Sequence, residues 1–141
     1  LIPGVDGQKM SKSYNNTIPI FGNDKEIRKK IMGIITDNSS VDDPKDKNTP
    51  LFHLYCLFAN KNEQQILSEK YDAPGLRYGD VKLELFEKIM DYFAPYRKKR
   101  SMLQSKPDDI KDILTLGAKK AKLVALEVLD KVRSIVGLHL N

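Results

Sequence analysis

The sequence predicts a mostly α-helical protein, in which a helical bundle over residues 23–141 follows a loop segment over residues 1–22. Two patterns predict this fold class. Turn-forming residues are frequent up to residue 22, and no helical stripe of apolar residues survives between them. After residue 22, apolar residues recur at the i, i+3, i+4 and i+7 spacing of a buried helix face. The connections between these stripes are mostly short enough to join antiparallel neighbours.

The loop segment is followed by a clear helix start. Its turn formers are Pro3, Gly4, Asp6, Gly7, Asn15, Asn16 and Pro19. Asn23 is a good N-cap for the first helix, and Glu26 stands three residues later, as in a capping box. The apolar stripe of this helix consists of Ile27, Ile31 and Ile34. Gly33 weakens the helix, and the polar run 36–40 ends it.

A polar loop over residues 36–50 precedes the second helix. Thr49 is a suitable N-cap, and Pro50 then occupies the first helical position, where a missing N–H costs nothing. The stripe that follows has the spacing of a buried helix face. It consists of Leu51, Leu54, Tyr55 and Phe58.

A third, short helix is predicted from Asn62 to Tyr71, with Ile66 and Leu67 facing inward. Residues 73–75 (Ala, Pro, Gly) break it. Asp80 is expected to cap the longer helix that comes next. The core face of that helix consists of Val81, Leu85, Phe86, Ile89, Met90 and Phe93.

The last third of the chain is also predicted to be helical. Pro95 should kink or interrupt the long helix, because proline removes a donor and clashes with the preceding turn. Helix then resumes to about Gln104, and a further stretch starts at residues 105–107. The strongest stripe lies after Gly117, and Gly137 is expected to stop that helix. The stripe consists of Ala121, Val124, Ala125, Val128, Val132 and Ile135.

The composition of the 141 residues excludes several protein classes. No stretch approaches the ~18 uncharged apolar residues that a membrane span needs, so no membrane partner is expected. Cys56 is the single cysteine, which excludes a disulfide framework and indicates a reducing compartment such as the cytoplasm. The chain opens at Leu1, without Met, inside a turn-rich segment. We therefore expect it to be a piece of a longer protein.

The positive charge is concentrated at one end of the chain. Residues 1–94 carry 13 basic and 14 acidic groups, whereas residues 95–141 carry 11 basic and 5 acidic groups. A basic end of this kind favours a polyanionic partner such as a nucleic acid. A solvated, lysine-rich helical surface would give the same count, so charge alone leaves both interpretations open.

The residues that suggest chemistry lie in the loop segment. Lys9 and Lys12 are separated by Met10 and Ser11 and are followed by Ser13. Two ammonium groups on flexible stems, with hydroxyls beside them, suit the oxygens of a polyphosphate. They would be most useful where negative charge builds up on a leaving pyrophosphate. A bare Lys-x-x-Lys spacing, however, is also common in hydrophilic loops.

The complete pentapeptide over residues 9–13 is identical to the KMSKS motif of class I aminoacyl-tRNA synthetases. A chance match of five residues is on the order of one in a million per position. The flanks resemble the bacterial-type tryptophanyl-tRNA synthetase family, and the resemblance covers essentially the whole chain as the C-terminal portion of such an enzyme. The similar positions are residues 3–7 and 14–16 around the motif, and residues 36–37, 43–46, 78–80, Lys82 and 91–97 beyond it.

This resemblance implies a domain organisation and an activity. Residues 1–22 would be the KMSKS catalytic loop and the end of a Rossmann-type nucleotide-binding domain, and residues 23–141 a helical anticodon-binding domain. Such enzymes activate tryptophan with ATP to give tryptophanyl-adenylate and pyrophosphate, and then transfer the amino acid to tRNA(Trp). The KMSKS loop closes over the ATP triphosphate. Mg²⁺ would arrive with the ATP, since no protein ligands for it are identified here, and the complete enzyme is expected to be a homodimer.

The resemblance also implies roles for single residues. Lys9 and Lys12 would be catalytic, with Lys12 the best candidate for direct ATP contact. Lys9 and Ser11 come second, and Ser13 completes the ATP-binding motif. Met10 would anchor the loop by packing.

One family motif is missing from the chain. The HIGH-type motif lies in the N-terminal part of the family's nucleotide-binding fold, and His53 and His139 are isolated and lack its glycine and histidine neighbours. The tryptophan pocket also belongs to that N-terminal part. The chain alone is therefore expected to be inactive.

Arg97, Lys98, Lys99 and Arg100 are candidates for tRNA contact, because arginine both pairs with phosphate and stacks on bases. A solvated helix face is the alternative for each of them. Two alternatives also stand for the whole chain. The first is a tyrosyl-tRNA synthetase fragment, and the second is a non-catalytic helical RNA-binding module that retains a vestigial loop.

Overall fold

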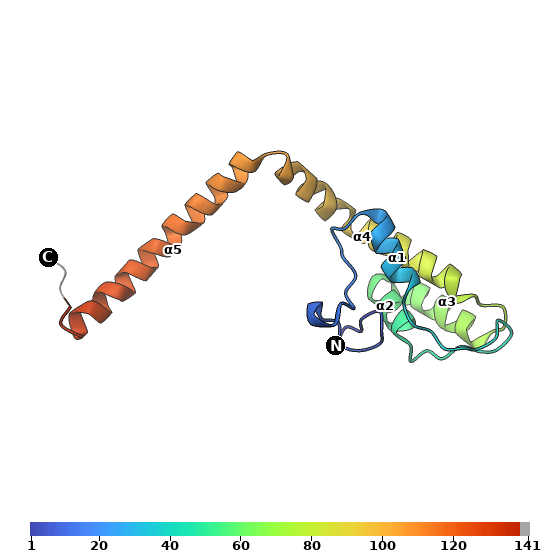
Figure 1. Cartoon of the computed structure of the whole chain (residues 1–141). Coiled ribbons are helices and arrows are strands. Elements are labelled where there is room, and N and C mark those ends of the chain that lie inside the picture. The colour runs from blue at the N-terminus through green and yellow to red at the C-terminus, as the bar shows by residue number, and fades with distance from the viewer. Residues whose placement is uncertain (139–141) are drawn as a thin grey trace. The chain divides into compact units, whose positions relative to one another are not determined.

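The computed structural model describes residues 1–138, so His139 lies outside the described residues. Five α-helices and one short 3₁₀ helix make up its regular structure (Figure 1). They are η1 (Lys12–Tyr14), α1 (Asp24–Met32), α2 (Pro50–Phe58), α3 (Lys61–Asp72), α4 (Tyr78–Gln104) and α5 (Pro107–Ile135). The described residues contain no β-strand beyond one isolated bridge between Pro3 and Lys9. The predicted mostly α fold class is confirmed.

The chain forms two compact units, Leu1–Arg97 and Lys98–Asn141. In the first unit, α1, α2, α3 and the start of α4 contribute to one hydrophobic core, and the predicted stripes supply it. The buried core residues are Ile27, Ile31, Ile34, Leu51, Leu54, Tyr55, Leu67, Tyr71, Val81, Leu85 and Ile89. The prediction for Ile66 was wrong, because this side chain is 44% exposed whereas Leu67 is 1% exposed. Adjacent helical positions point about 100° apart, so only one of the two reaches the core.

The helix starts follow the predicted caps in two of three cases. Asn23 Oδ1 accepts a hydrogen bond from the Glu26 N–H at 2.8 Å, and Thr49 Oγ1 accepts one from the Phe52 N–H at 3.4 Å. Asp80, in contrast, lies inside the first turn of α4, which already begins at Tyr78, so the predicted cap was wrong. Its carboxylate instead pairs with Arg77 at 3.3 Å. A negative charge in the first turn of a helix also interacts favourably with the helix dipole.

Pro95 does not interrupt α4, which runs from Tyr78 to Gln104. A proline inside a helix leaves the carbonyl four residues earlier without its donor. Here that carbonyl belongs to Asp91, and both Asp91 and Pro95 are exposed, so water can satisfy it. Solvation at an exposed helix face explains why the expected break is absent.

The second unit contains the end of α4 and the whole of α5, a single helix that continues through Gly117. Gly137 follows its end with a φ of +74°. The Gly137 N–H donates to Ser134 O and the Leu138 N–H donates to Arg133 O, which is the Schellman arrangement. The predicted helix stop at Gly137 is confirmed. No helix within residues 1–138 is long and apolar enough to cross a membrane.

Candidate functional site

The segment that leads into the predicted phosphate-binding motif is a tight reversal of the chain. The Gly4 N–H donates to Gln8 O at 2.7 Å, and the Met10 N–H donates to Ile2 O at 3.0 Å. At the tip, Gly7 has a φ of +79°, a conformation that favours glycine. The Gln8 N–H donates to Asp6 Oδ1 at 3.1 Å, which is the local turn bond that aspartate forms readily.

Asn16 holds the two ends of this loop together. Its side chain donates from Nδ2 to Asp6 Oδ1 at 2.8 Å and to Lys9 O at 3.0 Å, and its Oδ1 accepts from the Ser11 N–H at 2.7 Å. Asn16 is only 1% exposed, so all three bonds are shielded in part from water. An asparagine amide has two donors and one carbonyl acceptor, and here each of them is used. The backbone around Lys9 and Ser11 is therefore fixed by a single buried side chain.

The loop is also fixed to the rest of the first unit. A Cβ placed on Gly4 would lie 2.3 Å from Asn16 Nδ2, so only glycine allows the buried amide to approach this closely. The Ile35 N–H donates to Val5 O at 2.9 Å. Met10 is half-buried and packs against the hydrophobic core, as an anchoring residue should. The path of the loop is thus set by contacts on both of its sides.

The second half of the motif forms η1, which is capped at both ends. Ser11 Oγ accepts a hydrogen bond from the Ser13 N–H at 3.3 Å. Asn15 ends the turn with a φ of +53°, and Lys30 Nζ from α1 donates to Asn15 O at 2.9 Å and to Asn15 Oδ1 at 3.2 Å. Hydrogen bonds at both ends of η1 therefore order the backbone that carries Lys12.

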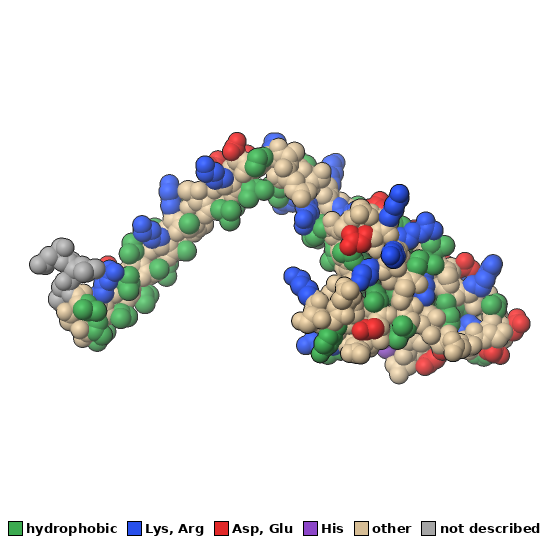
Figure 2. Space-filling model, viewed as in Figure 1, with side chains coloured by type: hydrophobic (Ala, Val, Ile, Leu, Met, Phe, Trp, Pro, Cys, Tyr) green, Lys and Arg blue, Asp and Glu red, His purple; other side chains and the backbone are tan. Residues whose placement is uncertain are grey.

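The polar side chains of the motif remain available to a ligand. Lys9, Lys12 and Ser13 are exposed, and Ser11 is half-buried. In the part of the chain that the structure describes, no carboxylate forms a salt bridge with Lys9 or Lys12. Figure 2 shows the Lys and Arg side chains that project from this unit. An ordered backbone that carries two unpaired ammonium groups can bind a polyphosphate.

The four predicted tRNA-contacting residues differ from one another in their surroundings. Arg97 donates from Nη1 to Ile20 O at 2.7 Å and to Gly22 O at 3.0 Å, and its Nη2 pairs with Asp24 at 2.6 Å. Its side chain is 23% exposed. In this structure Arg97 therefore fastens the end of the loop segment to α4. The three basic residues that follow it, Lys98, Lys99 and Arg100, are exposed.

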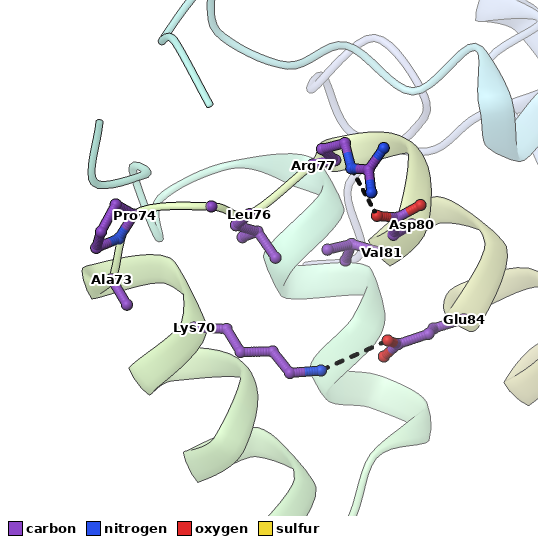
Figure 3. A pocket seen from close by; sticks show the side chains of 9 residues that line it. Lys70, Ala73, Pro74, Leu76, Arg77, Asp80, Val81 and Glu84 are labelled. Carbon is purple, nitrogen blue, oxygen red and sulfur yellow. Dashed lines mark ion pairs between the residues drawn. The ribbon is translucent and has the colours of Figure 1, made fainter. Parts of the chain in front are cut away.

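A pocket elsewhere in the first unit is lined by paired charges (Figure 3). Lys70 pairs with Glu84 at 3.6 Å, and Arg77 pairs with Asp80 at 3.3 Å. Glu84 also accepts a hydrogen bond from the Tyr55 hydroxyl at 3.1 Å. Because these charges neutralise one another, this pocket lacks the free positive charge of the KMSKS loop.

Sequence reasoning missed the two residues that organise the motif. Asn16 was predicted as a turn former and as one of the flanking positions similar to the family, without an organising role, and Lys30 was assigned no role. Neither position stands out, since an asparagine in a loop and a lysine on a surface helix are both common. Asn16 could have been suspected only from its place three residues after the motif.

Comparison with known proteins places this geometry in a family. The family model of class I tRNA synthetases (W and Y) matches residues 1–94. Tryptophan–tRNA ligase from Rhodopirellula baltica is 51% identical to the chain, and the match covers 98% of this chain and 43% of the ligase. The ligase from Fusobacterium nucleatum is 42% identical, over 98% of this chain and 42% of its own length.

A solved structure agrees with these relatives. The crystal structure of tryptophanyl-tRNA synthetase from Campylobacter jejuni, complexed with ADP and tryptophan, matches with a TM-score of 0.93 and 40% identity. That match covers 98% of this chain and 44% of the Campylobacter chain. The chain thus spans less than half the length of the relatives it matches and corresponds to their C-terminal portion. It belongs to the class I tRNA synthetase family of the tryptophan and tyrosine enzymes, and within that family it is similar to tryptophanyl-tRNA synthetases.

Proposed function

We propose that this chain is the C-terminal part of a tryptophan–tRNA ligase, which activates tryptophan with ATP and transfers it to tRNA(Trp). The observation that carries the proposal is the KMSKS pentapeptide at residues 9–13, held on an ordered backbone by buried Asn16. The similarity to tryptophan–tRNA ligases over 98% of the chain supports tryptophan rather than tyrosine as the amino acid. It also favours an enzyme part over a stand-alone RNA-binding module.

The chemistry assigned to the loop is electrostatic stabilisation of a leaving group. The carboxylate of tryptophan attacks the α-phosphorus of ATP, the bond from that phosphorus to the β-phosphate oxygen breaks, and pyrophosphate leaves with the bonding electrons. Lys12 contacts the phosphates directly, with Lys9 and Ser11 in supporting positions and Ser13 beside them. Positive charge on a fixed backbone is most effective where negative charge develops in the transition state. Mg²⁺ would arrive bound to the ATP. Met10 packs against the hydrophobic core and so keeps the loop attached to it.

The tRNA contacts are assigned to the basic residues at the end of α4. Lys98, Lys99 and Arg100 are exposed and would pair with phosphates. Arg97 was predicted with them. Its bonds to Ile20, Gly22 and Asp24 support a structural role in addition to tRNA contact. Neutralising Lys98 and Lys99 together should weaken tRNA binding and lower the slope of log K against log salt by roughly 1 to 2. An unchanged slope would leave these residues as surface charge.

The remaining parts of the proposal follow from the whole enzyme. Residues 1–22 end the nucleotide-binding domain, and residues 23–141 form the helical domain that reaches the anticodon. The complete ligase is a cytoplasmic homodimer. The 141-residue chain alone is inactive, because it lacks the family's HIGH-type motif and tryptophan pocket.

The proposed function is tested by amino-acid-dependent exchange of pyrophosphate into ATP by the complete ligase. Exchange should require tryptophan, and tyrosine should not replace it. Equal exchange with tyrosine would favour the tyrosyl enzyme. Absence of exchange with either amino acid would refute the enzyme assignment.

A further inference from the structure

Lys30 connects α1 to the KMSKS loop. It lies on α1, the blue helix of Figure 1, and its Nζ donates to Asn15 O at 2.9 Å and to Asn15 Oδ1 at 3.2 Å. The other basic side chains of α1, Lys25, Arg28 and Lys29, are exposed, whereas Lys30 is half-buried. Lys30 forms no salt bridge in the described part of the chain. Its ammonium group is therefore directed to two neutral oxygens of a single residue.

Asn15 needs this support because of its backbone conformation. Its φ of +53° is in the left-handed region, and among the described residues it is the only one other than glycine with a positive φ. A residue with a Cβ adopts this conformation at a cost, although asparagine tolerates it better than most. The two hydrogen bonds from Lys30 fix the directions of the Asn15 carbonyl and side-chain amide at once. Lys30 therefore stabilises the left-handed conformation against the extended alternatives.

The conformation of Asn15 in turn sets the backbone that carries Lys12. The Asn15 N–H donates to Lys12 O at 3.1 Å and closes the single turn of η1. A 3₁₀ helix of three residues has no further turn to hold it, so its geometry depends on the residue that ends it. Two consecutive contacts thus join Lys30 to the residue that we propose to bind the ATP phosphates.

α1 is a rigid support for this contact. Ile27 and Ile31 are fully buried in the hydrophobic core, and Lys30 directly precedes Ile31. A side chain on such an element holds a functional group more precisely than one on a loop. The three bonds of the Asn16 side chain, in contrast, all lie within residues 6–16. Asn16 orders the loop internally, and Lys30 ties η1 to the core through α1.

We propose that Lys30 is a positioning residue for adenylate formation, which acts on the phosphates through Lys12. The ammonium group of Lys30 has three N–H donors, and Asn15 engages two of them, so Lys30 orders the loop instead of binding the phosphates itself. A displacement of about 1 Å of a group that contacts the reacting atoms can cost on the order of 10²-fold in rate. This inference rests on the proposed function, in which Lys12 stabilises the leaving pyrophosphate.

Lys30→Met in the complete ligase tests this inference. Methionine keeps an apolar stem but cannot donate the two bonds to Asn15. We expect kcat of tryptophan-dependent ATP–pyrophosphate exchange to fall about tenfold with KM for tryptophan unchanged, because the misplaced group acts in the transition state. Lys29→Met is the matched control, because it removes an exposed charge from the same last turn of α1. It should leave exchange unchanged, and an equal loss in both variants would overturn the inference.

A double-mutant cycle with Lys12→Ala separates positioning from an independent effect. If Lys30 acts through Lys12, Lys30→Met should lower exchange less than about twofold in the Lys12→Ala background, because the group that it positions is already absent. The same loss in both backgrounds would show that Lys30 acts independently of Lys12 and would overturn the inference.

Tryptophan-dependent exchange by the unsubstituted ligase is measured in parallel. Its absence would refute the proposed function. Normal exchange by the unsubstituted ligase, with unchanged or faster exchange by Lys30→Met, would refute the positioning role alone.

Discussion

Replacement of Asn16 by alanine tests whether this buried amide orders the KMSKS loop. The variant removes the bonds to Asp6 Oδ1, Lys9 O and the Ser11 N–H. A neutral hydrogen bond contributes about 1 kcal/mol net, and one to a charged group about 1.5–3 kcal/mol. The two neutral bonds and the one to the Asp6 carboxylate together amount to about 4 kcal/mol. Because Asp6 and Ser11 are half-buried and water can replace part of the loss, we expect the loop to be destabilised by about 2–3 kcal/mol.

Hydrogen exchange of the loop amides measures this effect. A change of 2–3 kcal/mol in the free energy of loop opening corresponds to a decrease in protection on the order of 10²-fold. The affected amides should include those of Gly4, Met10 and Ser11, which donate hydrogen bonds within the loop. Amides of α3 should keep their protection, because the three bonds of the Asn16 side chain all lie within residues 6–16. Asp6→Asn, which keeps the shape but removes the charge, should give a smaller decrease.

Asn62→Ala is the matched control, since Asn62 is exposed on α3. It should leave the protection of all loop amides unchanged. If Asn16→Ala also left protection at Ser11 within about twofold of the unsubstituted chain, the assignment of Asn16 as the organising residue would be refuted.

Three further predictions concern the first unit. Gly4→Ala should lower the protection of the same loop amides, because the new Cβ would lie 2.3 Å from Asn16 Nδ2. Gly79→Ala is the control and should leave their protection unchanged, because its Cβ would meet no atom within 4 Å. Arg97→Ala should lower the free energy of unfolding by about 2 kcal/mol, because the variant loses the charged hydrogen bonds of Arg97. A denaturant titration measures this change. An unchanged midpoint of unfolding would contradict the role of Arg97 in fastening the loop segment to α4. The Ser39 hydroxyl, with other bonds, holds the pKa of the Asp37 carboxyl below its usual value. The stabilisation is therefore present above the unfolded pKa of about 4 and is lost as pH falls through the folded pKa. Asp37→Asn should remove this stabilisation, which is at most about 0.5 kcal/mol because the group is exposed. The free energy of unfolding should therefore depend less on pH between pH 3 and 6 in the variant. Curves of identical shape for the variant and the unsubstituted chain would contradict this prediction.

The sequence predicted the helices well because their apolar spacing is a local property. The stripe of Leu51, Leu54 and Tyr55 is buried, and Thr49 and Pro50 start α2 as expected. The predictions that failed depended on the surroundings of a residue. Asp80 lost its capping position because the helix begins earlier. The expected break at Pro95 is absent because an exposed helix tolerates the missing bond.

The candidate site was predicted in part for a similar reason. The identity of residues 9–13 marks the motif directly. The burial of Asn16 and its approach to Gly4 arise only when segments separated in the sequence fold together. Arg97 illustrates the same limit, because its contacts with Ile20 and Gly22 span more than 70 residues. Spacing rules along a helix carry no information about such contacts.

Replacement of Lys12 by alanine tests whether this lysine stabilises the leaving pyrophosphate. In the complete ligase, Lys12→Ala should lower tryptophan-dependent ATP–pyrophosphate exchange on the order of 10²- to 10³-fold, the usual cost of removing one group that stabilises transition-state charge. Binding of tRNA should change far less. Lys25→Ala, which removes an exposed lysine of α1, should leave exchange unchanged. Near-normal exchange by Lys12→Ala would show that Lys12 does not stabilise the leaving pyrophosphate.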